Sequence, residues 1–184
     1  MSSTDLFGQL QEIVDELEHE HSLPVEIFKD IPEELQEYTE LYHELDDAIA
    51  NFFVACIKQQ PYGSTNNLLR ECIAFLRSKG ITGKMVDQLI SPADVEYYNW
   101  DHSFLFLSLG ANNEQSAILK DFGCSLDYDL AQARGVEPNP YQRVSLQLKI
   151  DHYNRIFPER ITLGGKRRST KRRSKKYKKS YRII

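Results

Sequence analysis

Apolar side chains recur at intervals of three and four along most of this chain, a spacing that predicts amphipathic α-helices. The first helix is predicted to start after Ser3 or Thr4 as its cap and to end near His21. A long second helix is predicted over about 32–59, because Pro32 suits a first helical turn and the periodicity then continues unbroken. The apolar positions of these two helices are Leu6, Leu10, Ile13, Val14 and Leu17, then Leu35, Tyr38, Leu41, Tyr42, Leu45, Ile49, Phe52, Phe53, Cys56 and Ile57.

Shorter helices are predicted for the rest of the chain up to residue 160. The segment 103–109 could also form a strand, but no partner strand is evident, so a buried helix is favoured. The predicted ranges are about 64–79, 82–90, 92–108 with Ser91 as cap, 113–122, 126–134, and a last helix from Pro140 to about Phe157. The apolar residues of that last helix are Val144, Leu146, Leu148, Ile150, Tyr153 and Ile156. The predicted fold class is therefore all-α, an irregular multi-helix bundle with one long helix.

Charge divides the chain into three blocks, and this changes the picture from a plain helical bundle. Residues 1–50 hold 15 carboxylates and one lysine, a formal charge of −14. Residues 51–160 hold 12 acidic and 11 basic side chains and are nearly neutral, whereas residues 164–184 hold 11 basic and no acidic side chains. We therefore expect an acidic helical body over 1–160, with core helices over 51–160, and a basic tail over 161–184.

The tail carries the candidate binding residues. Its short basic clusters, separated by Ser, Thr and Tyr, cannot bury apolar area, so we expect it to be disordered unless a partner orders it. Cations can follow a phosphate backbone while tyrosine rings stack on exposed bases, which favours nucleic acid as the partner. An acidic protein surface and a nuclear-localisation signal are the alternatives. The candidate residues are Lys166, Arg167, Arg168, Lys171, Arg172, Arg173, Lys175, Lys176, Tyr177, Lys178, Lys179, Tyr181 and Arg182.

The acidic block is the obvious counterpart of this tail. A charge of −14 in 50 residues repels itself, and a basic partner would offset that repulsion. The partner could be the tail of the same chain or that of a neighbouring copy. Head-to-tail contacts between copies would give filaments or lattices if they do not close.

Catalytic and metal-binding motifs give weaker signals. In the run 18–21, His19 and His21 are two residues apart and so point to different faces of a helix, which predicts a solvated helix end and no metal site. The carboxylate pairs Asp46–Asp47 and Asp127–Asp129, and the single His102, are interpreted as caps and packed or solvated side chains. Phosphate-binding loops, a serine nucleophile elbow and a Cys-x-x-Cys motif are absent from the sequence. The prediction is a protein that is not an enzyme and needs no cofactor.

Three further features of the sequence indicate the cellular compartment in which the protein is expected. The chain has no apolar run of 18 residues and no apolar segment at its start, so neither a membrane span nor a signal peptide is expected. Cys56, Cys72 and Cys124 lie in apolar contexts and are predicted to be buried free thiols. We expect a location in a virion or inside the cell, and not a secreted protein.

The run that begins Leu163-Gly164-Gly165-Lys166 and continues through the basic clusters resembles the Gly-Gly-Lys basic ends of small structural proteins of large double-stranded DNA viruses. The resemblance covers only about a tenth of the chain. It implies a virion component, such as a minor capsid or core protein. The leading hypothesis is thus a structural or adaptor protein that docks through its body and binds nucleic acid or an acidic surface through its tail. The alternative is a nuclear-targeted regulatory protein whose tail is only a localisation signal.

Overall fold

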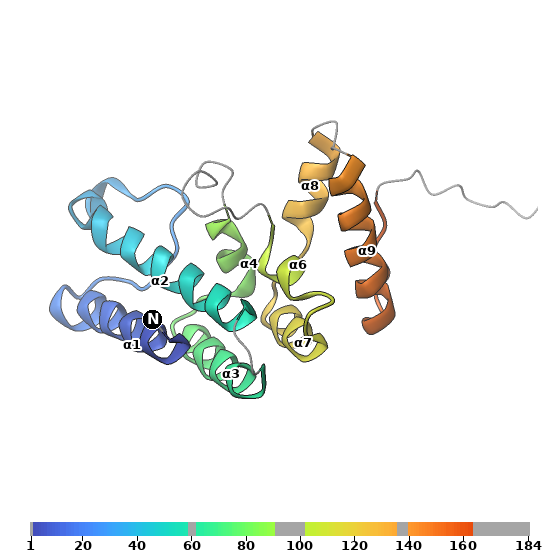
Figure 1. The fold of residues 1–184 in the computed structure, drawn as a ribbon. Helices are drawn as coiled ribbons and strands as arrows, with labels where there is room; N and C mark the ends of the chain where they lie inside the picture. Colours follow the sequence, from blue (N-terminus) through green and yellow to red (C-terminus); the bar gives the residue numbers. More distant parts are fainter. Residues whose placement is uncertain (1, 59–61, 91–101, 136–139, 164–184) are drawn as a thin grey trace, which may run out of the picture.

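The computed structural model describes residues 2–58, 62–90, 102–135 and 140–163, and within these ranges the secondary structure is helical without strands (Figure 1). The predicted all-α fold class is confirmed. The elements are α1 (Ser3–Asp15), a π-helical turn η1 (Glu16–Glu20), a 3-10 helix η2 (Glu33–Tyr38), α2 (Thr39–Lys58), α3 (Tyr62–Ser78), α4 (Gly83–Val86), a 3-10 turn η3 (Asp87–Leu89), α6 (Phe104–Ser108), α7 (Asn113–Phe122), α8 (Asp127–Gly135) and α9 (Pro140–Ile156).

The cap of helix α1 is Ser2, one residue before Ser3, the earlier of the two predicted caps. The Ser2 side chain accepts a hydrogen bond from the Asp5 backbone N–H at 3.2 Å, and the Asp5 carboxylate accepts one from the Ser2 backbone N–H at 2.9 Å. This reciprocal pair is a capping box, and it satisfies two backbone donors that a helix start leaves open. The apolar face that follows is buried, with Leu10, Val14 and Leu17 fully covered.

The long second helix is a composite. The predicted range of about 32–59 holds the 3-10 helix η2 and then α2. None of the residues of η2 is buried, so packing does not impose α geometry on that first stretch. From Tyr42 onward the side chains that face α1 are covered, and the helix is α-helical.

The core lies where α1, α2 and α3 meet and extends toward α6 and α7 (Figure 1). Phe53 of α2 links the two parts, because its ring centroid lies 5.3 Å from that of Phe104 and 6.0 Å from that of Phe122. On the other side Phe52 contacts Phe7 at 5.6 Å, and Phe7 contacts Phe75 of α3 at 5.9 Å. A chain of aromatic contacts therefore connects four helices and one short helical turn.

Two short elements meet at close backbone range. A Cβ atom at Gly83 would lie 2.5 Å from the Cys124 nitrogen and 2.6 Å from the Gly123 carbonyl carbon. Gly123 ends α7 with φ of 111°, a left-handed conformation that glycine adopts without strain. The start of α4 thus packs backbone to backbone against the end of α7.

One sequence prediction about the second half is wrong. The predicted helix 92–108 does not run through, because Ser103 is in extended conformation and caps a new helix, α6, by accepting from the Phe106 N–H at 3.1 Å; residues 91–101 lie outside the described ranges. The choice of a helix over a strand for the segment 103–109 is nevertheless confirmed, with the helix covering Phe104–Ser108. In α9, the apolar residues Val144 and Leu148 are 60% and 61% exposed. Residues two apart lie on opposite sides of a helix, so the partners Leu146 and Ile150 take the buried side.

Cys56, Cys72 and Cys124 are free and buried, as predicted. Within the described ranges, the structure has no helix that combines the length and apolar character needed to cross a bilayer.

Candidate functional site

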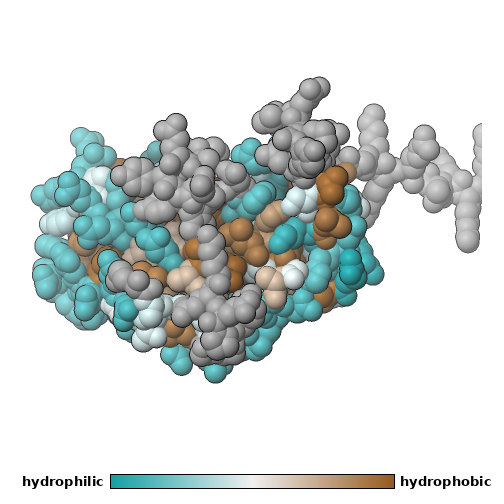
Figure 2. Space-filling model, in the orientation of Figure 1, coloured by the Kyte–Doolittle hydropathy of each residue, from teal (hydrophilic) through white to brown (hydrophobic). Residues whose placement is uncertain are grey.

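The predicted binding residues of the tail, Lys166 to Arg182, lie outside the described residues. The geometry that the structure supplies belongs to the body, and above all to its acidic end. None of the 15 acidic residues of 1–50 is buried as a whole, although one carboxylate oxygen of Asp46 is covered. They lie on α1, η1, the segment before η2, η2 itself and α2, and hydrophilic side chains dominate this end of the surface in Figure 2.

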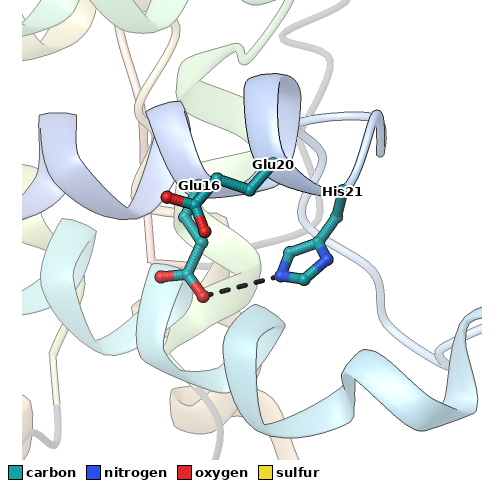
Figure 3. A group of neighbouring side chains, drawn as sticks. All are labelled: Glu16, Glu20 and His21. Atoms are coloured by element: carbon teal, nitrogen blue, oxygen red, sulfur yellow. Dashed lines mark ion pairs between the residues drawn. The ribbon is translucent and has the colours of Figure 1, made fainter.

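The end of the first helix gathers two carboxylates and one imidazole. Glu16, Glu20 and His21 each offer one ligand atom, and these atoms lie within 4.8 Å of one another. The His21 Nε2 atom lies 3.6 Å from the Glu16 Oε1 atom. Figure 3 shows the carboxylates of Glu16 and Glu20 side by side, facing the His21 ring. We call these three residues the helix-end cluster.

A widened helical turn brings the helix-end cluster together. The backbone N–H of His21 donates to the Glu16 carbonyl, five residues earlier, at 3.2 Å, and the N–H of Leu23 donates to the Leu17 carbonyl, six residues earlier, at 2.7 Å. In a π-turn the residue five positions on returns to the side of the helix where the turn began, so His21 lies beside Glu16. Ser22 then leaves the helix with φ of 56°, a left-handed conformation that is uncommon for a residue other than glycine.

The neighbouring residues of the run 18–21 have other partners. Glu18 forms an ion pair with Lys79, the residue directly after α3, at 2.5 Å, and both side chains are less than one third exposed. His19 lies 4.0 Å from Asp15 in a fully solvated position. The structure thus separates His19 from His21, as helical spacing predicts, but it pairs His21 with Glu16 and Glu20. The α-helical spacing used for the sequence does not reveal that grouping, because Glu16 and His21 are five residues apart.

Asp129, a member of the carboxylate pair Asp127–Asp129, is buried in a polar junction between α8 and α6. Its carboxylate accepts from the Ser103 hydroxyl at 2.6 Å and the Ser103 backbone N–H at 3.3 Å, and it contacts His102 Nδ1 at 2.9 Å. The serine hydroxyl therefore donates to the carboxylate and not to the imidazole. A serine nucleophile needs the imidazole on its hydroxyl, so this junction fastens α8 to the start of α6 and does not match that catalytic arrangement.

Asp87 of η3 makes a second such junction. Its carboxylate accepts from the Ser125 backbone N–H at 2.7 Å and from the Ser125 hydroxyl at 3.2 Å. Burial raises the pKa of Asp87 to about 6, and the hydrogen bonds from Ser125 only partly oppose that rise. Together with the contact between Gly83 and Cys124, this junction joins the α4–η3 segment to the chain just after α7.

Basic residues of the described body also have local roles. Arg70 pairs with Glu114 at 2.6 Å, and the same carboxylate accepts from Asn66 at 2.8 Å. These bonds hold the pKa of Glu114 below its usual range. They tie α3 to the start of α7 and so belong to the scaffold.

The chain was compared with protein-family models, curated proteins and solved structures, and none of the three comparisons gives a match. Its function is therefore inferred from its own residues.

Proposed function

We propose that this chain is a non-enzymatic structural or adaptor protein, a virion component that docks through its helical body and binds nucleic acid through its basic tail. The observation that carries the proposal is the tail itself, with 11 Lys and Arg among its last 21 residues and no carboxylate. Such a segment can neutralise a phosphate backbone without a fixed fold. The resemblance of the Gly-Gly-Lys tail to those of small viral structural proteins supports the assignment to a virion.

The distribution of charge supports a division of labour between the two parts. Nearly all carboxylates of residues 1–50 lie at the surface of the acidic end, and a polyanion would be repelled there. Nucleic acid is accordingly expected to contact the tail and to stay away from α1 and η2. The body is left to contact neighbouring proteins.

The test measures binding of the full-length chain to duplex and single-stranded oligonucleotides across a salt series, by fluorescence anisotropy. If all 11 cations met duplex phosphates, the slope of log K against log salt would approach about −10. A variant with the 11 tail cations replaced by Gln should lose this binding, and its circular dichroism should remain that of the unaltered chain. Equal affinity in that variant would refute the proposal.

Two matched variants separate the contributions within the tail. A shuffled tail keeps the charge and should keep the salt slope. Replacement of Tyr177 and Tyr181 by Ala should weaken binding to single strands, where stacking contributes about 1–3 kcal/mol per base, and leave duplex binding nearly unchanged.

The alternatives predict different outcomes in the same experiments. If the tail is only a nuclear address, a reporter fused to it should enter nuclei while the purified protein shows no salt-sensitive binding. If the tail binds an acidic protein surface, such as residues 1–50 of a neighbouring copy, light scattering should show particles that shrink as salt rises.

A further inference from the structure

We propose that the helix-end cluster, Glu16, Glu20 and His21, is a binding site for one Zn²⁺ ion. The proposal is independent of the function of the tail. It starts from the observation that three side chains of metal-ligating type point into one small volume at the end of the first helix (Figure 3).

The spacing of the ligand atoms fits a tetrahedral zinc ion. Bonds of about 2.0–2.1 Å at tetrahedral angles place two ligand atoms about 3.4 Å apart. The separation between His21 Nε2 and Glu16 Oε1 is 3.6 Å, and the third ligand atom lies within 4.8 Å of both. Glu20 is exposed, so its side chain has room to adjust toward the other two ligands.

Backbone and packing hold the imidazole in place. The π-turn fixes His21 directly beside Glu16, and its i+5 hydrogen bond sets the position of the His21 backbone. The ring of Tyr38, on η2, lies against the His21 ring with centroids 5.1 Å apart. Two segments far apart in sequence therefore position one ligand, and less side-chain freedom is lost when an ion binds.

The donor set selects among metals. An imidazole nitrogen suits zinc and other first-row transition metals, whereas Ca²⁺ takes six to eight oxygen ligands and Mg²⁺ keeps an octahedral shell of water and carboxylate. Two carboxylates and one imidazole supply three of the four ligands that Zn²⁺ takes, and water supplies the fourth. The imidazole is what distinguishes this cluster from the many solvated carboxylates around it.

The surrounding charge favours a cation. The cluster lies within the block of 15 carboxylates and one lysine, whose combined field raises the local concentration of cations. Glu18, the carboxylate between the ligands, is already engaged by Lys79 on the side of α3. Within the described part of the chain, no Lys or Arg pairs with the Glu16 or Glu20 carboxylate, so a divalent ion would relieve their mutual repulsion.

The experiment titrates Zn²⁺ into the full-length chain and measures stoichiometry and affinity by isothermal titration calorimetry, with thermal melting in parallel. One Zn²⁺ per chain and a rise in the melting temperature are expected, and excess Mg²⁺ should not displace the ion. Loss of one ligand in His21→Ala or Glu20→Gln should weaken binding by at least about 10–100-fold, the loss typical of removing a mere outer-shell partner, and abolish the rise in melting temperature. Co²⁺ in place of Zn²⁺ should show the visible absorption of a tetrahedral site in the unaltered chain only.

The matched control is His19→Ala, since His19 lies two residues away, is exposed and has its own carboxylate neighbour in Asp15. It should leave Zn²⁺ affinity unchanged. Glu20 is exposed, so Glu20→Gln tests the ligand role even if His21→Ala disturbs the contact with Tyr38. The proposal is overturned if the unaltered chain binds no stoichiometric Zn²⁺, or if His19→Ala weakens binding as much as His21→Ala.

Discussion

Helices α1 and α9 carry comparable numbers of apolar residues but are attached to the body in different ways. In α1 and the η1 turn that continues it, Leu10, Val14 and Leu17 are spaced by four and three, and all are completely buried. In α9 the apolar residues 144, 146, 148 and 150 are spaced by two, and only Leu146 and Ile150 are buried. Because two residues correspond to about 200° around a helix, the second pattern divides its apolar residues between opposite sides. The spacing of apolar residues, more than their number, decides how firmly a helix is held.

Polar contacts compensate for the narrow buried face of α9. The Lys149 ammonium donates to the Leu109 carbonyl and lies 5.1 Å from the centre of the Phe106 ring. His152 contacts the Asn113 side chain at 2.8 Å. Just beyond the helix, Glu159 pairs with Lys120 at 2.7 Å. Apolar burial therefore holds α1, whereas directional bonds and cations contribute much of the attachment of α9.

The largest expected effect compares one substitution on the two helices. Leu10→Ala should destabilise the fold by about 2–5 kcal/mol, because the residue is fully buried and its truncation leaves a cavity. Leu148→Ala should change stability by less than about 0.5 kcal/mol, since that side chain is 61% exposed. Urea denaturation of both variants measures the difference. Equal losses would show that the exposed face of α9 is covered in solution.

A second test asks whether the tight packing of the α1 region extends to α4. Gly83→Ala should cost about 1–3 kcal/mol or more, because the added methyl group would overlap backbone atoms of Gly123 and Cys124. The control is Gly8→Ala within α1, where no atom lies within 4 Å of the added Cβ. That change should stabilise the fold by about 0.5–1 kcal/mol through helix propensity. Thermal melting should therefore move in opposite directions for the two variants, and a fall for both would contradict the packing described.

The smallest effect concerns carboxylates in the two regions. Burial raises the pKa of Asp87 from 3.8 to about 6, so the folded state holds this proton more tightly than the unfolded state. The contribution of the protonated Asp87 carboxyl to the free energy of unfolding is complete below about pH 4 and is lost as pH rises to about 6. Asp87→Asn, which keeps an acceptor for Ser125, should remove this loss. Relative to the unaltered chain, the variant should gain about 1–2 kcal/mol between pH 4 and pH 7, allowing for the partial exposure of the group.

Glu159, beside α9, should give the opposite sign. The hydrogen bond from Lys120 lowers its pKa, so its contribution is present above its ordinary value of 4.5 and is lost as pH falls. Glu159→Gln should therefore lose a little stability at neutral pH and none in acid, as urea denaturation at several pH values can measure. If the stability difference from the unaltered chain changed with pH in the same direction for both variants, the two carboxylates would not differ in environment.

Most helix positions could be predicted from periodicity and punctuation. Gly123 ends α7 where the sequence indicates, and Pro140 opens α9. The differences from the predicted helices have local causes. The Ser103 side chain accepts a hydrogen bond from the Phe106 backbone N–H and so starts a new helix. After Pro32 the chain adopts 3-10 geometry, in a stretch where no side chain is buried. The exposure of Val144 and Leu148 in α9 follows from their spacing, because residues two apart from Leu146 and Ile150 lie on the opposite side of the helix.

The candidate sites were less accessible to sequence reasoning. The helix-end cluster depends on a π-turn, which brings residues five apart into contact. No residue pattern in the run 16–21 predicts that turn. The burial of Asp129 depends on its contact with Ser103, 26 residues away in the chain. Long-range contacts of this kind are set by packing and are not written in local spacing. The basic character of the tail, by contrast, follows directly from its composition, and its binding to a polyanion is a prediction.

The three buried cysteines can be used as probes of how the core of the molecule opens. Burial raises the pKa of Cys56 to about 11 and raises those of Cys72 and Cys124 as well, so the reactive thiolate is nearly absent in the closed fold. Because the thiols lie on α2, on α3 and directly after α7, each one becomes available to an alkylating reagent only when its own part of the core separates. Their relative labelling rates under native conditions would thus distinguish a fold that opens as one cooperative unit from one that opens in stages.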